Sequence, residues 1–161
     1  MNGGHGIKSM RSRPFALWLL IVLVVLMGLS ALISGPMLFL EPSGHLVQWS
    51  VEDLKGTPFS DYTIPGIILF VFLGVYPSFV GYSLLRLPAW KWPDALNPTK
   101  DYHWAWSASW AAGAIILLWI AVETLLLGYI SFLQPMVAVW GVVIVILTLL
   151  PGVRRYFRQE A

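Results

Sequence analysis

From Trp104 to Val153 this chain runs for fifty residues with one formally charged side chain, Glu123. A small soluble domain has no core large enough to bury so long an apolar stretch. A bilayer, whose hydrocarbon core is about 30 Å thick, accepts it as helices of about 20 residues each. Over the whole chain 58% of the residues are hydrophobic and 11% are charged. The sequence therefore predicts an integral membrane protein that has the lipid bilayer as its partner.

Apolar segments long enough to cross the bilayer occur four times, so we predict an all-α fold, a four-transmembrane-helix bundle. The turn before the last segment is short, which makes the last two helices antiparallel and favours an up-down-up-down order. A single membrane domain, 15–152, is expected between two tails, 1–14 and 153–161. The predicted helices cover about 15–34, 65–85, 108–130 and 135–150.

The basic residues lie on one side of this predicted bundle. Nine of the ten Lys and Arg residues are in the two tails or in the connection after the second helix, and the opposite side carries Lys55 alone. Because cytoplasmic loops of membrane proteins are enriched in Lys and Arg, both termini are expected in the cytoplasm. The net charge is +2, but its basic residues sit beside apolar segments, so nucleic-acid binding is not expected.

The connection between the first two helices predicts a short extracytoplasmic helix of its own. Ser50 followed by Asp53 resembles a capping box at the start of a helix at about 51–55. Farther along, Asp61 or Thr63 is placed to cap the second membrane helix. We expect this connection to lie on the bilayer surface or over the bundle.

Glu123 is the main candidate for a functional residue. A charged side chain in hydrocarbon costs about 2.5–3.5 kcal/mol on insertion scales, so an ionisable group inside a membrane helix is a functional hypothesis. Glu123 lies seven residues before the predicted end of the third helix, about 10 Å below that interface. Its candidate partners at this depth are Ser30, Thr124 and Trp140, none of which is a cation. The sequence thus predicts a buried polar site in which Glu123 is a neutral acid.

Several roles of Glu123 remain open at this stage. A neutral carboxylic acid is a good interhelical hydrogen-bond donor, which is a structural role. The alternatives are proton or cation handling, contact with a ligand, and a place in a subunit interface. Replacement of Glu123 by Gln separates these roles, because a structural hydrogen bond should survive the change and proton transfer should stop.

Small residues four positions apart predict where helix backbones approach each other. Association of helices in lipid depends on close packing, since moving apolar side chains from lipid to protein gives no hydrophobic gain. Such pairs mark each of the first three predicted helices: Ala31/Gly35, Gly74/Ser78 and Ser109/Gly113.

Pro77 interrupts the middle of the second predicted helix. It leaves the carbonyl of Leu73 without its usual donor, and Gly74 and Gly81 lie nearby. The pattern predicts a kink, which serves either as a bend for packing or as a hinge.

Tryptophan is concentrated in and after the connection between helices 2 and 3. Its indole ring favours the headgroup layer, where the apolar ring and the polar N–H each find their own phase. We interpret these residues as an interfacial aromatic belt. An aromatic platform for a quinone, a pigment or a cationic headgroup is the alternative. The residues are Trp90, Trp92, Trp104, Trp106 and Trp110.

Enzymatic chemistry finds little support in the sequence. The histidines His5, His45 and His103 lie outside the predicted spans, which argues against a bis-histidine haem within the bundle. The chain has no cysteine, and its acidic residues match no metal-ligand spacing. We therefore assign no catalytic residue, no metal site and no cofactor.

Four short stretches of the chain carry a family resemblance: Pro-Ser-Gly at 42–44, LKGTPFSDYTIPG at 54–66, GYISFLQP at 128–135 and LPGVRRY at 150–156. From about Pro42 onward the chain resembles a group of small, uncharacterised prokaryotic four-helix integral membrane proteins. The resemblance implies a multi-pass protein of the prokaryotic cytoplasmic (inner) membrane and brings no activity with it. Similar proteins favour Gln near the position of Glu123, which implies an interhelical hydrogen bond there.

Two classes of function follow from these observations. The first is a non-catalytic membrane protein, a structural or accessory subunit that associates with other membrane subunits. The second is a small transporter or channel for protons or cations that self-associates and uses Glu123. The first class is preferred, because transport usually needs more than one polar station along the path.

Overall fold

A computed structural model describes residues 12–159. Within this range the chain is helical, and its β contact is one isolated bridge between Tyr102 and Arg158. The predicted all-α class is confirmed for these residues. The elements are α1 (Phe15–Leu40), η1 (His45–Val47), η2 (Val51–Leu54), α2 (Thr63–Ile68), η3 (Leu69–Val75), α3 (Tyr76–Arg86), α4 (Lys91–Ala95), α5 (Trp104–Leu127), α6 (Leu133–Leu149) and α7 (Pro151–Phe157).

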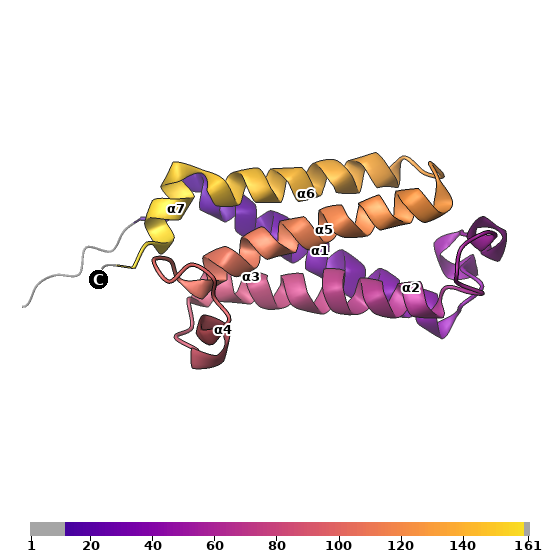
Figure 1. Cartoon of the computed structure of the whole chain (residues 1–161), viewed down its shortest axis with the longest axis horizontal. Coiled ribbons are helices and arrows are strands. Elements are labelled where there is room, and N and C mark those ends of the chain that lie inside the picture. The colour runs from indigo at the N-terminus through magenta and orange to yellow at the C-terminus, as the bar shows by residue number, and fades with distance from the viewer. Residues whose placement is uncertain (1–11, 160–161) are drawn as a thin grey trace, which may run out of the picture.

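Three helical spans within residues 12–159 are long and apolar enough to cross a membrane: α1, the continuous run from α2 to α3, and α5. α6 and α7 pass the same test together, with a bend of 61° between them, and give a fourth candidate. In Figure 1 these helices lie alongside one another, with the first connection (41–62, purple) at one end of the bundle and α4 and α7 at the other. Most of the predicted N-terminal tail, 1–11, lies outside the described residues.

α5 begins four residues and ends three residues earlier than predicted. The imidazole Nδ1 of His103 accepts a hydrogen bond from the backbone N–H of Ala105 (3.2 Å) and caps the first turn. At the other end Gly128 has φ +70°, a conformation that glycine adopts far more easily than other residues. Residues 128–130, expected in the helix, therefore belong to the turn before α6.

The kink predicted at Pro77 is replaced by a different feature. Directly before Pro77, η3 forms a π-helix of seven residues, in which the N–H of Tyr76 donates to the carbonyl of Val71, five residues back. This wider turn means that the carbonyl four residues before Pro77 no longer depends on a donor at that position. Figure 1 shows α2 and α3 following one another along one line.

α1 packs closely on the second span through glycines. A Cβ atom built on Gly66 would lie 2.8 Å from the Cβ of Leu38, and one on Gly74 would lie 3.1 Å from the backbone nitrogen of Leu32. Gly35 lies in the same interface. The close approach predicted from small residues on these two helices is therefore present.

The end of the chain folds back instead of forming a tail from residue 153. α7 starts at Pro151, and Val153 is fully buried against the bundle. Because proline has no N–H, the last carbonyls of α6 lose a donor. The indole N–H of Trp106 donates to one of them, the carbonyl of Thr148 (2.8 Å).

Apolar side chains fill the middle of the bundle. Each of the four long spans contributes at least one residue with no exposed surface to the main buried cluster, and a smaller cluster of Leu38, Leu54 and Tyr62 lies under the first connection. Representative members are Leu20, Val24, Val80, Ile116 and Ile144.

Candidate functional site

A pocket of about 390 Å³ lies between the first connection, the second span and α5. It exists because η3 packs mainly on α1 and touches α5 little. The described residues that line it are apolar or aromatic with few exceptions, and Glu123 is the only charged one among them. At its rim Phe72 and Leu118 are exposed by 50% and 65%. The pocket therefore opens toward the outer surface of the bundle.

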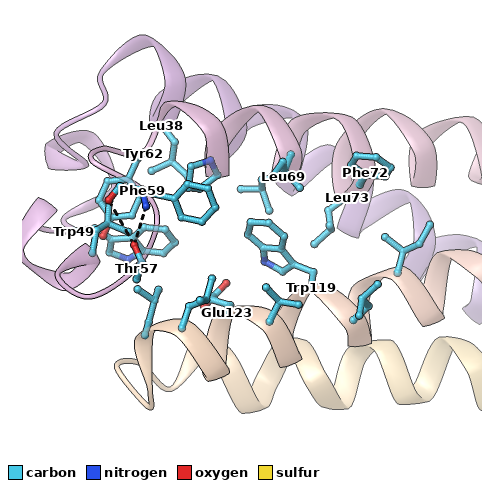
Figure 2. Close-up of a pocket in the computed structure, with 18 residues that line it drawn as sticks. Leu38, Trp49, Thr57, Phe59, Tyr62, Leu69, Phe72, Leu73, Trp119 and Glu123 are labelled. Carbon is cyan, nitrogen blue, oxygen red and sulfur yellow. Dashed lines mark hydrogen bonds between the residues drawn. The ribbon is translucent and has the colours of Figure 1, made fainter.

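Glu123 reaches into this pocket from α5. It lies four residues before the last residue of α5, Leu127, which is about 6 Å along the helix axis. Glu123 is thus closer to the helix end than the sequence predicted. Trp119, one helical turn earlier, projects from the same face. Figure 2 shows both side chains directed from α5 toward the first connection and η3.

The partners expected for Glu123 are engaged elsewhere. The indole N–H of Trp140 donates to the carbonyl of Leu23 in α1 (3.2 Å). The hydroxyl of Ser30 donates to the carbonyl of Leu26 within its own helix (2.8 Å). Thr124 is exposed. The polar site predicted from depth alone is therefore not assembled, because depth does not say which face of a helix a side chain occupies.

Two other residues, which the sequence did not suggest, lie beside Glu123 instead of the expected partners. The side chains of Trp119 and Gln134 are the polar neighbours of the Glu123 carboxyl group. Gln134 is 3% exposed and also holds the turn between α5 and α6. Its amide oxygen accepts from the N–H of Ile130 (2.9 Å), and its Nε2 donates to the carbonyl of Gly128 (3.0 Å). The sequence signal that could have pointed to Gln134 is its position beside the short turn between the last two predicted helices.

Tyr62 closes the pocket on the side of the first connection. It is 2% exposed, its hydroxyl donates to the carbonyl of Ser50 (2.9 Å), and its ring centre lies 5.6 Å from that of Trp49. Burial raises the pKa of Tyr62 to about 12, with smaller contributions from the carboxylates of Asp53 and Glu123. Ionisation of this phenol is therefore suppressed.

Local capping positions the first connection above the pocket. The predicted capping box is present in η2: the N–H of Ser50 donates to the carboxylate of Asp53 (3.3 Å), and the Ser50 hydroxyl accepts from the N–H of Glu52 (3.2 Å). At the start of α2 the carboxylate of Asp61 accepts from the N–H of Thr63 (2.8 Å), as predicted. These bonds fix both ends of the segment that carries Phe59 and Tyr62, two of the aromatic residues that line the pocket.

The predicted aromatic belt divides into two groups. Trp90, Trp92 and Trp110 are exposed, as expected of interfacial residues, whereas Trp104 and Trp106 are 4% and 7% exposed and are packed inside. The indole N–H of Trp104 donates to a backbone carbonyl (3.0 Å). The two buried rings therefore contribute to the core, because each finds an acceptor there.

A second cavity, of about 830 Å³, lies beside these rings. Phe79 stacks on three tryptophan rings at 5.6–5.7 Å between ring centres. Asn97 supplies the main polar group: its amide oxygen accepts from the hydroxyl of Ser107 (2.7 Å), and its Nδ2 donates to the carbonyl of Tyr102 (2.8 Å). The polar groups of this cavity are thus used internally, and a role as an aromatic platform stays a prediction.

Within residues 12–159 no group of three or more acidic or histidine side chains lies close enough together to hold a metal ion. Comparison with known proteins finds no matching family model, no matching curated protein and no matching solved structure. The resemblance drawn from the sequence motifs therefore stays a prediction.

Proposed function

We propose that this chain is a non-catalytic integral membrane protein, a structural or accessory subunit of a membrane complex. The observation that supports the proposal is the use of polar side chains within the spans as links between helices. The indole of Trp140 in α6 donates to Leu23 in α1 (3.2 Å), and the hydroxyl of Tyr76 in α3 donates to Ala108 in α5 (3.1 Å). These side chains hold the bundle together.

A third link joins α5 to α6. The indole of Trp106 donates to the carbonyl of Thr148 (2.8 Å), and the hydroxyls of Ser109 and Thr148 lie 3.3 Å apart. Side-chain hydrogen bonds between membrane helices contribute about 0.6 kcal/mol on average, and up to about 1.7. These hydrogen bonds hold the helices in fixed positions, which suits a bundle whose outer faces associate with other membrane subunits.

We place both termini in the cytoplasm and the protein in the cytoplasmic membrane of a prokaryote, with several crossings. Charge supports this orientation. The end of the bundle with α4 and α7 carries most of the described basic residues, whereas the first connection carries acidic residues and Lys55. The basic set is Arg13, Arg86, Lys91, Lys100, Arg154, Arg155 and Arg158.

The proposal is tested by isolating the protein from native membranes in lipid nanodiscs and measuring the mass of the particle. A stoichiometric second protein is expected, and its amount in the membrane should fall when this chain is deleted. Restoring the chain with Glu123→Gln should restore the partner, because the linking side chains are unchanged. A homo-oligomer whose loss alters no other membrane protein would refute the accessory role.

A second function is favoured by one specific observation: Glu123 lies in an open pocket, unlike the linking side chains inside the bundle. The alternative is an oligomeric transporter or channel for protons or cations. Purified protein in liposomes is tested for proton and sodium flux. Flux that is lost in Glu123→Gln and kept in Glu52→Gln, an exposed carboxylate paired with Lys55, would favour this alternative over the first.

A further inference from the structure

We propose that the Glu123 pocket binds a cationic amphiphile, a small molecule with one ammonium head and one hydrocarbon tail. The head lies at Glu123 beneath the first connection, and the tail lies along η3 and α5. This inference goes beyond the accessory role and does not depend on it, because the residues that line the pocket all come from one chain.

Charge complementarity is the first argument for this ligand. Glu123 is the only charged residue among the described residues that line the pocket, and none of them is Lys, Arg or His. Its polar neighbours, Trp119 and Gln134, are uncharged. A carboxylate without a counter-ion is costly in an apolar site, so Glu123 is a neutral acid when no cation is bound. An ammonium head supplies the missing charge, and Glu123 gives up its proton when the cation binds. A phospholipid fits less well, because its phosphate would find no basic partner.

The aromatic side chains around Glu123 are the second argument. Trp49, Phe59 and Tyr62 from the first connection face Trp119 from α5 across the pocket (Figure 2). The face of an aromatic ring attracts a cation, and groups of such rings are a recurring means of holding quaternary ammonium ions. One carboxylate among several rings therefore matches an ammonium head.

The shape of the pocket accounts for the tail. The part beyond Trp119 is lined by apolar side chains such as Phe72, Leu73 and Ile115. A volume of about 390 Å³ falls within the range of ligand pockets, about 300–1,000 Å³. Glu123 is about 6 Å from the end of α5, so the head lies near the membrane surface and the tail points toward the bundle centre. An amphiphile in a bilayer has the same orientation.

Binding of radiolabelled dodecyltrimethylammonium tests the proposal. The full chain is placed in phosphatidylcholine nanodiscs, and empty nanodiscs give the background from partition into lipid. Saturable binding of one molecule per chain is expected. Glu123→Gln should weaken it at least tenfold. Trp119→Leu, which keeps the charge and removes one ring, should weaken it by about threefold or more. Glu52→Gln should bind like the wild type.

Competition separates the head from the tail. Unlabelled dodecyltrimethylammonium should displace the label, whereas dodecanol, with the same chain and no charge, should not. Circular dichroism and thermal unfolding establish that each variant is folded, and Trp119→Leu decides the question if Glu123→Gln is not. The proposal is overturned if binding never exceeds that of empty nanodiscs, if dodecanol competes equally, or if folded Glu123→Gln binds like the wild type.

Discussion

Replacing Gly66 by alanine tests the close packing of α1 on α2. The added Cβ would lie 2.8 Å from the Cβ of Leu38 and 2.9 Å from the backbone nitrogen of Phe39. Non-bonded carbon atoms prefer about 3.5–4.0 Å, so the two helices must separate by roughly 0.7 Å. Backbone atoms and a Cβ cannot rotate away as the end of a long side chain can. The whole interface must therefore respond.

The size of the effect follows from two opposing contributions. Overpacking of this kind costs about 1–3 kcal/mol, and a gap of 0.5–1 Å forfeits about a quarter to a half of each neighbouring contact. Against this cost, alanine stabilises a helix by up to about 1 kcal/mol relative to glycine because of its higher helix propensity. We expect Gly66→Ala to lower the free energy of unfolding by about 1 kcal/mol.

Equilibrium unfolding in mixed micelles, followed by circular dichroism, measures this difference. Gly152→Ala is the matched control, because the nearest atom to its added Cβ is the Cβ of Pro14 at 3.9 Å. That variant should be as stable as the wild type or more stable by up to about 1 kcal/mol. If Gly66→Ala matches Gly152→Ala, the glycine contact does not limit packing and the reasoning is refuted.

Two further predictions concern caps and turns. Burial lowers the pKa of His103, so the folded state binds fewer protons than the unfolded state, and stability should be complete above about pH 6.5 and decrease as the pH falls below it. The thermal midpoint measured from pH 8 to pH 5 should fall less in His103→Asn, which keeps an acceptor for Ala105. Gln134→Leu should destabilise the protein by about 1–3 kcal/mol, because it leaves backbone groups of the turn without partners. Gln134→Asn, which keeps the amide on a shorter side chain, should lose less in the same unfolding assay, and equal losses would contradict the assignment.

Most helix ends were predictable to within about four residues because their signals are local, but α1 continues six residues beyond its predicted end at 34, through Pro36 to Leu40. The apolar runs, the Ser50 and Asp53 capping box and the cap at Asp61 depend on neighbours in sequence, and the structure contains each of them. The exceptions have local causes as well. Gly128 ends α5 early, and a π-helix before Pro77 takes the place of a kink.

The candidate site was predictable only at its centre. Glu123 is conspicuous because it is the one charged residue in a long apolar stretch. Its neighbours were misjudged: Trp140 and Ser30 have other acceptors, while Trp119 and Gln134 lie beside it. The depth of a residue can be estimated from the helical rise, but its direction depends on how each helix is rotated about its axis.

The sequence alone determined that this is a helical membrane protein, because fifty nearly uncharged residues have no other stable setting. It also singled out Glu123, since a lone carboxylate in such a stretch carries a large desolvation cost. Only the tertiary structure decided what surrounds that carboxylate. Because η3 packs on α1 more than on α5, a pocket opens beside α5, and the aromatic rings of the first connection cover that pocket. Those contacts join residues far apart in the chain, so no local pattern encodes them.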